Sequence, residues 1–259
     1  MRRELKYLVR ESDRQRLAAR IAPFVVPDPH ASDAAPEASG DGRGYTVRSA
    51  YYDTVRLRDW AEKESGDEIR RKVRVRTYDA PGSSPVVLEI KRKENMAVWK
   101  DRAPMTAEQA AALLAGGSPE ALVGLSPGVR LAAERFLYRL RAEHRRPTLL
   151  VTYDREPFVG RLDPSLRITF DRRLRVSLFP RLGPDLGGLY AERQRPVRPG
   201  AFILEVKFDR AFPSWMRSVV GAFGLRQQAL SKYALGMEAE ARSAPWRLGP
   251  PAVSALARP

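Results

Sequence analysis

Three segments of the chain repeat one chemical pattern, an acidic residue two positions before a lysine. The three pairs are Glu4/Lys6, Glu89/Lys91 and Glu205/Lys207. If each segment is a β-strand, this spacing places both side chains on the same face. The carboxylate could then bind a hard divalent cation while the ammonium binds a phosphate oxygen. One pair would mean little, because surface strands often mix charges, but three indicate a site for a metal ion and a polyphosphate.

The segment from Ile69 to Tyr78 supplies further cations. As a strand, it would present on one face Arg70, Lys72, Arg74 and Arg76. Its other face would present Ile69, Val73 and Val75, with Arg71 among them. A helix would scatter these cations around its axis, and the β-branched valines favour a strand. The row of four cations is either the solvated face of an amphipathic strand or one wall of an anion site.

Eight segments show the two-residue period of a strand, most with charges on the polar face. They are residues 4–9, 45–53, 69–78, 86–93, 148–155, 166–171, 175–179 and 202–209. Helices are expected from Ser12 or Asp13 to about Ile21 or Pro23, and over residues 54–63, 106–115, 126–144, 214–223 and 231–241. An open sheet leaves its charged face in water, whereas a closed barrel can turn that face inward when helices cover the outside. The pattern therefore favours a barrel whose charged lumen forms a tunnel.

The net charge indicates the class of ligand. Lysine and arginine number 46 against 31 acidic residues, a formal charge of +15. Such a field attracts polyanions, among them nucleic acid, anionic membrane, nucleotides and phosphate chains. Sites for single-stranded nucleic acid interleave aromatic residues with the cations for base stacking, and the basic strands here have few. We therefore expect no specific nucleic-acid partner.

The absence of cysteine excludes disulfides, thiolate catalysis and zinc–thiolate sites. No run of about 20 apolar residues could span a membrane, and the N-terminus lacks an apolar signal region. The predicted compartment is the cytoplasm. We expect a single domain over residues 1–241, with a mobile loop over residues 27–44 and a loosely ordered, proline-rich tail over residues 242–259.

Several segments, taken in order, resemble the VTC-type polyphosphate polymerase domain of the triphosphate tunnel (CYTH-like) superfamily. They include Glu4-Leu-Lys-Tyr7, Ser49-Ala-Tyr-Tyr-Asp53, Lys72-Val-Arg-Val-Arg-Thr-Tyr78, Leu88-Glu-Ile-Lys-Arg-Lys93, Thr152-Tyr-Asp-Arg-Glu-Pro-Phe158, Arg167-Ile-Thr-Phe-Asp171, Leu204-Glu-Val-Lys-Phe208 and Ser231-Lys-Tyr233. The resemblance spans nearly all of residues 2–240. It implies an α+β fold, an eight-stranded antiparallel β-barrel tunnel with helices around it, which binds ATP and polyphosphate with Mn²⁺ or Mg²⁺.

The resemblance also implies roles for individual residues. The phosphate ligands that it places at the reacting centre are Arg74, Arg76, Lys91 and Arg167. Further substrate ligands are Lys6, Arg155, Lys207 and Lys232, and the entrance residues are Lys63, Lys100 and Arg102. Glu205 is the implied metal carboxylate, and Glu89 assists it. Tunnel triphosphatases usually begin with alternating glutamates, and Arg2 replaces the first of these here, which favours the polymerase branch.

The implied activity is that of an ATP:polyphosphate phosphotransferase, which adds the terminal phosphate of ATP to a growing chain inside the tunnel. Two alternatives stay open. One is an inorganic triphosphatase of the same fold, in which water replaces the phosphate acceptor. The other is a non-catalytic module that binds polyphosphate or another polyanion. Families of this kind sometimes act beside transmembrane modules, so a membrane-associated partner also stays open.

Overall fold

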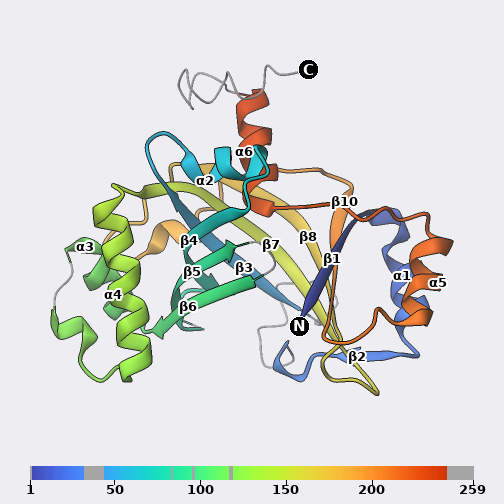
Figure 1. Ribbon diagram of the computed structural model, residues 1–259. Helices are drawn as coiled ribbons and strands as arrows, with labels where there is room; N and C mark the ends of the chain where they lie inside the picture. Colours follow the sequence, from blue (N-terminus) through green and yellow to red (C-terminus); the bar gives the residue numbers. More distant parts are fainter. Residues whose placement is uncertain (1, 32–43, 83, 95–96, 117–118, 244–259) are drawn as a thin grey trace. The chain divides into compact units, whose positions relative to one another are not determined.

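The computed structural model describes residues 2–31, 44–82, 84–94, 97–116 and 119–243 (Figure 1). Most of the predicted loop over residues 27–44, and nearly all of the predicted tail over residues 242–259, lie outside the described residues. The chain divides into two compact units. The first comprises residues 1–47, 152–174 and 196–231, and the second comprises residues 48–151, 175–195 and 232–259. The single domain predicted over residues 1–241 stays a prediction.

Three long strands contribute residues to both units. They are β3 (Tyr45–Asp53), β7 (Arg146–Gly160) and β8 (Arg167–Leu178).

In the first unit, β1 (Arg3–Arg10) pairs antiparallel with β10 (Ala201–Phe208), and β10 pairs antiparallel with β8. The short strand β2 (Val25–Pro27) pairs with β7. Alternate apolar residues of β10, such as Leu204 and Val206, share a core with the helices α1 (Arg14–Ile21) and α5 (Ser214–Ala222). Because one face of these strands packs on helices, their charged residues occupy the other face.

In the second unit, β4 (Ile69–Tyr78), β5 (Val86–Glu94) and β6 (Ala97–Met105) form an antiparallel ladder. The helices α3 (Ala107–Ala115) and α4 (Pro127–Ala142) pack against it. Val73, Val75 and Leu88 belong to the same buried core as Phe136 of α4. A capping box at Thr106 starts α3. The unit also contains α2 (Arg58–Glu64) and α6 (Lys232–Ser243).

The strand order along the sheet is β1-β10-β8-β7-β3-β4-β5-β6, while β9 (Arg195–Pro196) pairs with β8 beside this path. Among the described residues, β1 and β6 end this order, and the strands form a large antiparallel sheet that does not close into a barrel. The prediction of a mixed fold with a large antiparallel sheet and flanking helices is confirmed. The closure of this sheet into a tunnel stays a prediction.

Most predicted elements are present. The short strands β2 and β9 were not expected, and two longer strands, β8 and β6, also differ from the prediction. Residues 166–171 and 175–179 were expected as two strands but form the single strand β8, in which Arg173 adopts a positive φ of 48°. Strand β6 was not expected, because its exposed residues Trp99, Lys100 and Arg102 break the alternation of apolar and polar positions. Its place at the end of the strand order explains this pattern, because an edge strand needs few buried side chains.

Candidate functional site

Charged side chains form facing rows on one side of the first unit. Across β1, β10 and β8, one row consists of Glu4, Lys207 and Arg167, and the next consists of Lys6, Glu205 and Thr169. The Glu205 carboxylate is 4% exposed and lies 3.4 Å from the Lys6 ammonium and 3.0 Å from that of Lys207. Lys6 lies 3.0 Å from the Glu4 carboxylate. Acids therefore face bases across β1 and β10, whereas Lys207 faces Arg167 across β10 and β8. The two residues of each pair share a face of their strand, as their two-residue spacing predicted.

Arg155 of β7 extends this group of charges. Its guanidinium donates two hydrogen bonds to Asp171, at 2.7 and 2.8 Å, and lies 3.7 Å from Glu205. Burial would lower the pKa of Arg155, but the carboxylates of Asp171 and Glu205 raise it well above its usual value. Arg155 is therefore a permanent, well-oriented cation, as a phosphate ligand requires.

The carboxylates of this unit fit a hard divalent cation. Burial would raise the pKa of Glu4, but Lys6 and Lys207 lower it to about 2. Glu4 and Glu205 both lie beside the Lys6 ammonium, so this face offers two carboxylates as oxygen donors. Among the described residues, no cluster of three or more acidic or histidine ligands is arranged around one point. Mg²⁺ is commonly held by one or two carboxylates, with phosphate oxygens and water completing its shell. The two carboxylates of Glu4 and Glu205 match that number of protein ligands.

Two partners in this unit were missed by sequence reasoning. Arg167 forms an ion pair with Asp28, which is buried. Thr169 stands directly across from Glu205 and is 7% exposed, and its hydroxyl has no hydrogen-bond partner among the residues that the structure describes. The position of Thr169 between Arg167 and Asp171, with the period of a strand, was the only signal for it in the sequence.

The second unit carries rows of predominantly positive charge. Across β4, β5 and β6, the facing residues are Arg74, Glu89 and Arg102 in one row, Lys72, Lys91 and Lys100 in the next, and Arg70 and Lys93 in the third. Like charges that face each other directly across strands are destabilising. A sheet that holds three lysines abreast therefore maintains an unfavourable arrangement, which a bound anion would relieve.

Ser49 and Tyr51 of β3 hold two of the three arginines of the predicted reacting centre, Arg76 and Arg74. The Arg76 Nε donates to the Ser49 hydroxyl at 3.0 Å, and an Arg74 terminal nitrogen donates to the Tyr51 hydroxyl at 2.9 Å. Glu89 forms an ion pair with Arg74 and lies 3.7 Å from Arg102. Burial would raise the pKa of Glu89, but Arg74 and its neighbouring cations lower it. These contacts identify Glu89 first as a partner of arginines, and its predicted role in metal binding stays a prediction.

The structure brings most of the predicted residues together within one unit or the other. The first unit groups Lys6, Arg155, Arg167, Lys207 and Glu205, and the second groups Arg74, Arg76, Lys91, Lys100, Arg102 and Glu89. Two predicted residues lie outside the strand rows. Lys63 is in the last turn of α2, and Lys232 begins α6 and is buried.

Comparison with known proteins identifies the family. The model of the VTC domain family matches residues 1–240. The chain belongs to the VTC domain family. This confirms the resemblance seen in the sequence segments. The comparison with curated proteins gives no match to this VTC domain.

Several solved structures match this VTC domain over most of its length at low sequence identity. A protein of Bacillus halodurans proposed to be an adenylate cyclase is 13% identical, with a TM-score of 0.48, covering 88% of this chain and 92% of that chain. A protein of Pyrococcus horikoshii is 12% identical, with a TM-score of 0.44 and coverages of 90% and 97%. Another proposed adenylate cyclase, from Vibrio parahaemolyticus, is 10% identical, with a TM-score of 0.43 and coverages of 90% and 96%. Within the described part of this chain, no helix has the length and apolar character needed to cross a membrane.

Proposed function

We propose that this VTC domain is a metal-dependent polyphosphate polymerase that transfers the terminal phosphate of ATP to a growing polyphosphate chain. The observation that carries the proposal is the set of facing cations on β4, β5 and β6. These rows, together with Arg76, contain eight cationic side chains and one carboxylate, that of Glu89. Such an excess on one face favours a ligand with many negative charges.

The extent of this face supports a chain as the ligand. From Arg70 to Arg76 the strand advances six residues, or about 20 Å at the usual rise of a strand. One triphosphate would occupy only part of that length, whereas an extended phosphate chain would contact cations along all of it. The closed tunnel of the family is part of this proposal and rests on the family resemblance.

The proposed chemistry needs positioning and charge neutralisation more than covalent catalysis. Arg74, Arg76 and Lys91 would bind and orient phosphate oxygens in the second unit, and Lys6, Arg155, Arg167 and Lys207 would do so in the first. The terminal phosphate of the chain is already ionised near neutral pH, so its oxygen can attack the γ-phosphorus of ATP without a general base. The bond between the γ- and β-phosphates would break, and ADP would leave. Glu205 and Glu4 would hold a divalent cation, with Glu89 as a further candidate, and the cation would offset negative charge on the phosphate oxygens.

A triphosphatase of the same fold is the second candidate. The observation that favours it is Glu4, which gives Glu205 a second carboxylate even though Arg2 replaces the preceding acid. Two carboxylates and the same cations would equally serve attack by water. A module that only binds polyphosphate would use the cation rows without needing either glutamate.

Glu205→Gln separates catalysis from binding, because it removes a negative charge from the site while keeping the size of the side chain. The variant and wild type would be incubated with ATP, Mn²⁺ and a phosphate primer, and assayed for chain growth, for orthophosphate and for polyphosphate binding. We expect lost turnover with binding kept or strengthened. Glu134→Gln, on an exposed position of α4, is the matched control and should behave as wild type. Full turnover in Glu205→Gln would contradict the proposed metal site.

A further inference from the structure

Tyr51 contacts Arg74 in two ways. Its hydroxyl accepts a hydrogen bond from the guanidinium at 2.9 Å, and the guanidinium carbon lies 5.6 Å from the centroid of its ring. The other terminal nitrogen of Arg74 is paired with Glu89. The two ends of the guanidinium are therefore held by different strands, Tyr51 on β3 and Glu89 on β5.

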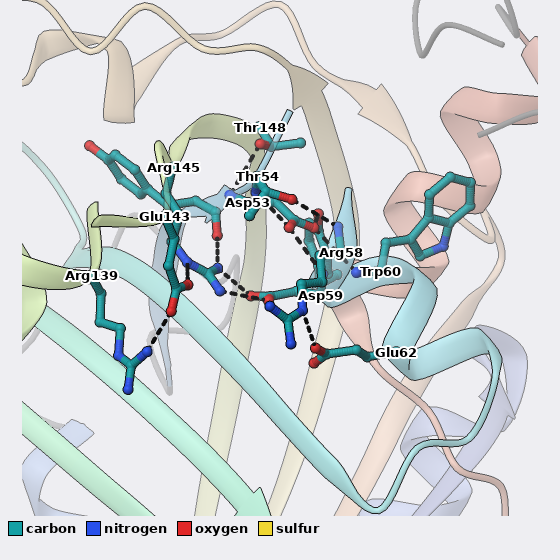
Figure 2. A network of polar contacts seen from close by, with 12 residues as sticks. Asp53, Thr54, Arg58, Asp59, Trp60, Glu62, Arg139, Glu143, Arg145 and Thr148 are labelled. Atoms are coloured by element: carbon teal, nitrogen blue, oxygen red, sulfur yellow. Dashed lines mark hydrogen bonds and ion pairs between the residues drawn. The ribbon is translucent and has the colours of Figure 1, made fainter. Parts of the chain in front are cut away.

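Tyr51 is itself held firmly. It is 6% exposed, and its ring stacks on Tyr233 of α6, with centroids 5.0 Å apart and planes inclined by 26°. The Tyr233 hydroxyl donates to Asp53 at 2.6 Å. The Asp53 carboxylate in turn accepts hydrogen bonds from the backbone N–H groups of Asp59 and Trp60 at the start of α2 (Figure 2). The Tyr51 ring thus rests on a tyrosine whose position is fixed by a buried hydrogen-bond network.

We propose that Tyr51 is a positioning residue of the phosphate site, whose hydroxyl fixes the Arg74 guanidinium in the orientation that binds phosphate. This inference rests on the proposed role of Arg74 as a phosphate ligand. It also accounts for a polar phenol at a buried position beside cations, because a phenylalanine would fill the same space without accepting the hydrogen bond.

The charges around Tyr51 give this arrangement a measurable signature. Burial would raise the pKa of the phenol, but Arg74, Lys72 and Arg76 lower it to about 7. The groups that face it are these three cations on β4, Tyr233 on α6, and Glu89 on β5 behind Arg74. Ionised Tyr51 would place a negative charge against Arg74, so phosphate affinity should fall as pH rises above about 7. By linkage, bound phosphate should raise the pKa of Tyr51.

The test compares Tyr51→Phe with Tyr52→Phe. Tyr52 is the adjacent residue, equally buried, but it packs edge-on against Phe136 in the core on the opposite face of β3. Binding of tripolyphosphate to each full-length protein would be measured by calorimetry from about pH 6 to about pH 9. Binding does not require turnover, so the test can succeed or fail independently of the polymerase proposal.

We expect Tyr51→Phe to bind tripolyphosphate about threefold to tenfold more weakly than wild type near pH 6, as the loss of one ordering hydrogen bond implies. Its affinity should also lack the additional decline that wild type shows above about pH 7, while Tyr52→Phe follows wild type. Ionisation of the ligand is common to all three proteins and cancels. Equal binding by Tyr51→Phe at every pH, or weaker binding that keeps the wild-type decline, would overturn the inference.

A second measurement uses wild type itself. Tyrosinate absorbance in the near ultraviolet should reveal one phenol that ionises near pH 7, and tripolyphosphate should move that ionisation to higher pH. The signal should be missing in Tyr51→Phe. A titration that tripolyphosphate does not move would overturn the coupling between the Tyr51 hydroxyl and the phosphate site.

Discussion

Replacement of Arg145 by methionine should destabilise the protein far more than replacement of an exposed arginine nearby. Arg145 is buried directly before β7 and donates to Asp59 at 2.6 and 2.9 Å, to Glu143 at 2.6 Å and to the Tyr52 carbonyl at 3.2 Å (Figure 2). Its side chain is 1% exposed and that of Asp59 is 3% exposed. The methionine would leave the Asp59 carboxylate buried without its cation.

The contacts give the size of the loss. Each hydrogen bond to a charged group contributes about 1.5–3 kcal/mol, and part of this is offset because the variant no longer buries a guanidinium. Breaking one half of a buried ion pair typically costs about 3–5 kcal/mol, and we expect Arg145→Met to fall in that range near pH 8. Burial already raises the pKa of Asp59 to about 6 in the presence of Arg145. Without the cation this pKa should rise further, so the loss should shrink as pH falls and Asp59 takes up a proton in the folded state.

The assay is urea unfolding followed by far-ultraviolet circular dichroism at several pH values. Arg58→Met is the control, because Arg58 lies on the same helix as Asp59, is 61% exposed and pairs with Glu62 one turn away. That variant should lose no more than about 0.5 kcal/mol. The double variant Asp59→Leu/Arg145→Met should be more stable than Arg145→Met alone, since it buries no unpaired charge. A loss below about 1 kcal/mol for Arg145→Met, or a double variant less stable than the single one, would refute this reasoning.

Three further predictions concern acid stability, chain length and helix packing. Two lysines lower the pKa of Glu4, so Glu4→Gln should remove stability of the order of 1–2 kcal/mol that wild type has above about pH 4.5 and loses as pH falls toward 2. Urea midpoints at pH 5 and pH 3 should therefore differ less in the variant than in wild type. Lys93→Ala should weaken binding of long phosphate chains about fivefold while leaving tripolyphosphate binding nearly unchanged. Arg92→Ala, on the opposite face of β5, should change neither affinity, and equal effects of both variants in calorimetry would contradict this prediction. Gly236→Ala should lower the thermal midpoint, because its Cβ would lie 2.7 Å from a core leucine methyl, whereas Gly221→Ala, with open space in α5, should raise it.

The strands that carry the site were predictable because one face of each strand is apolar and packs in the core, while the other face carries charged side chains. The alternation in β4 and β5 gave the bounds of β4 and the separation of Val73 and Val75 from the cations, and the structure shows those valines in the core. The same period placed Glu205 and Lys207 on the polar face of β10. In such strands the side-chain period alone separates the core from the site.

Partners from other strands were not predictable from spacing. Tyr51 lies 23 residues before Arg74, and a single sequence does not give the register between their strands. Arg145 meets Asp59 across 86 residues, and Asp28 meets Arg167 across 139. Strand β6 was not predicted because apolar and polar residues do not alternate along its exposed part. Long-range register and edge position, which depend on the whole fold, decide these features.

The most direct test of the proposed polymerase follows the terminal phosphate of ATP. Wild type would be incubated with ATP labelled at that phosphate, Mn²⁺ and a short phosphate primer, and the products separated by chain length on a gel. The account predicts that label enters chains longer than the primer, and that it does so in neither Glu205→Gln nor Arg74→Ala. Label found only in orthophosphate, with the primer unextended, would contradict the polymerase and favour the triphosphatase.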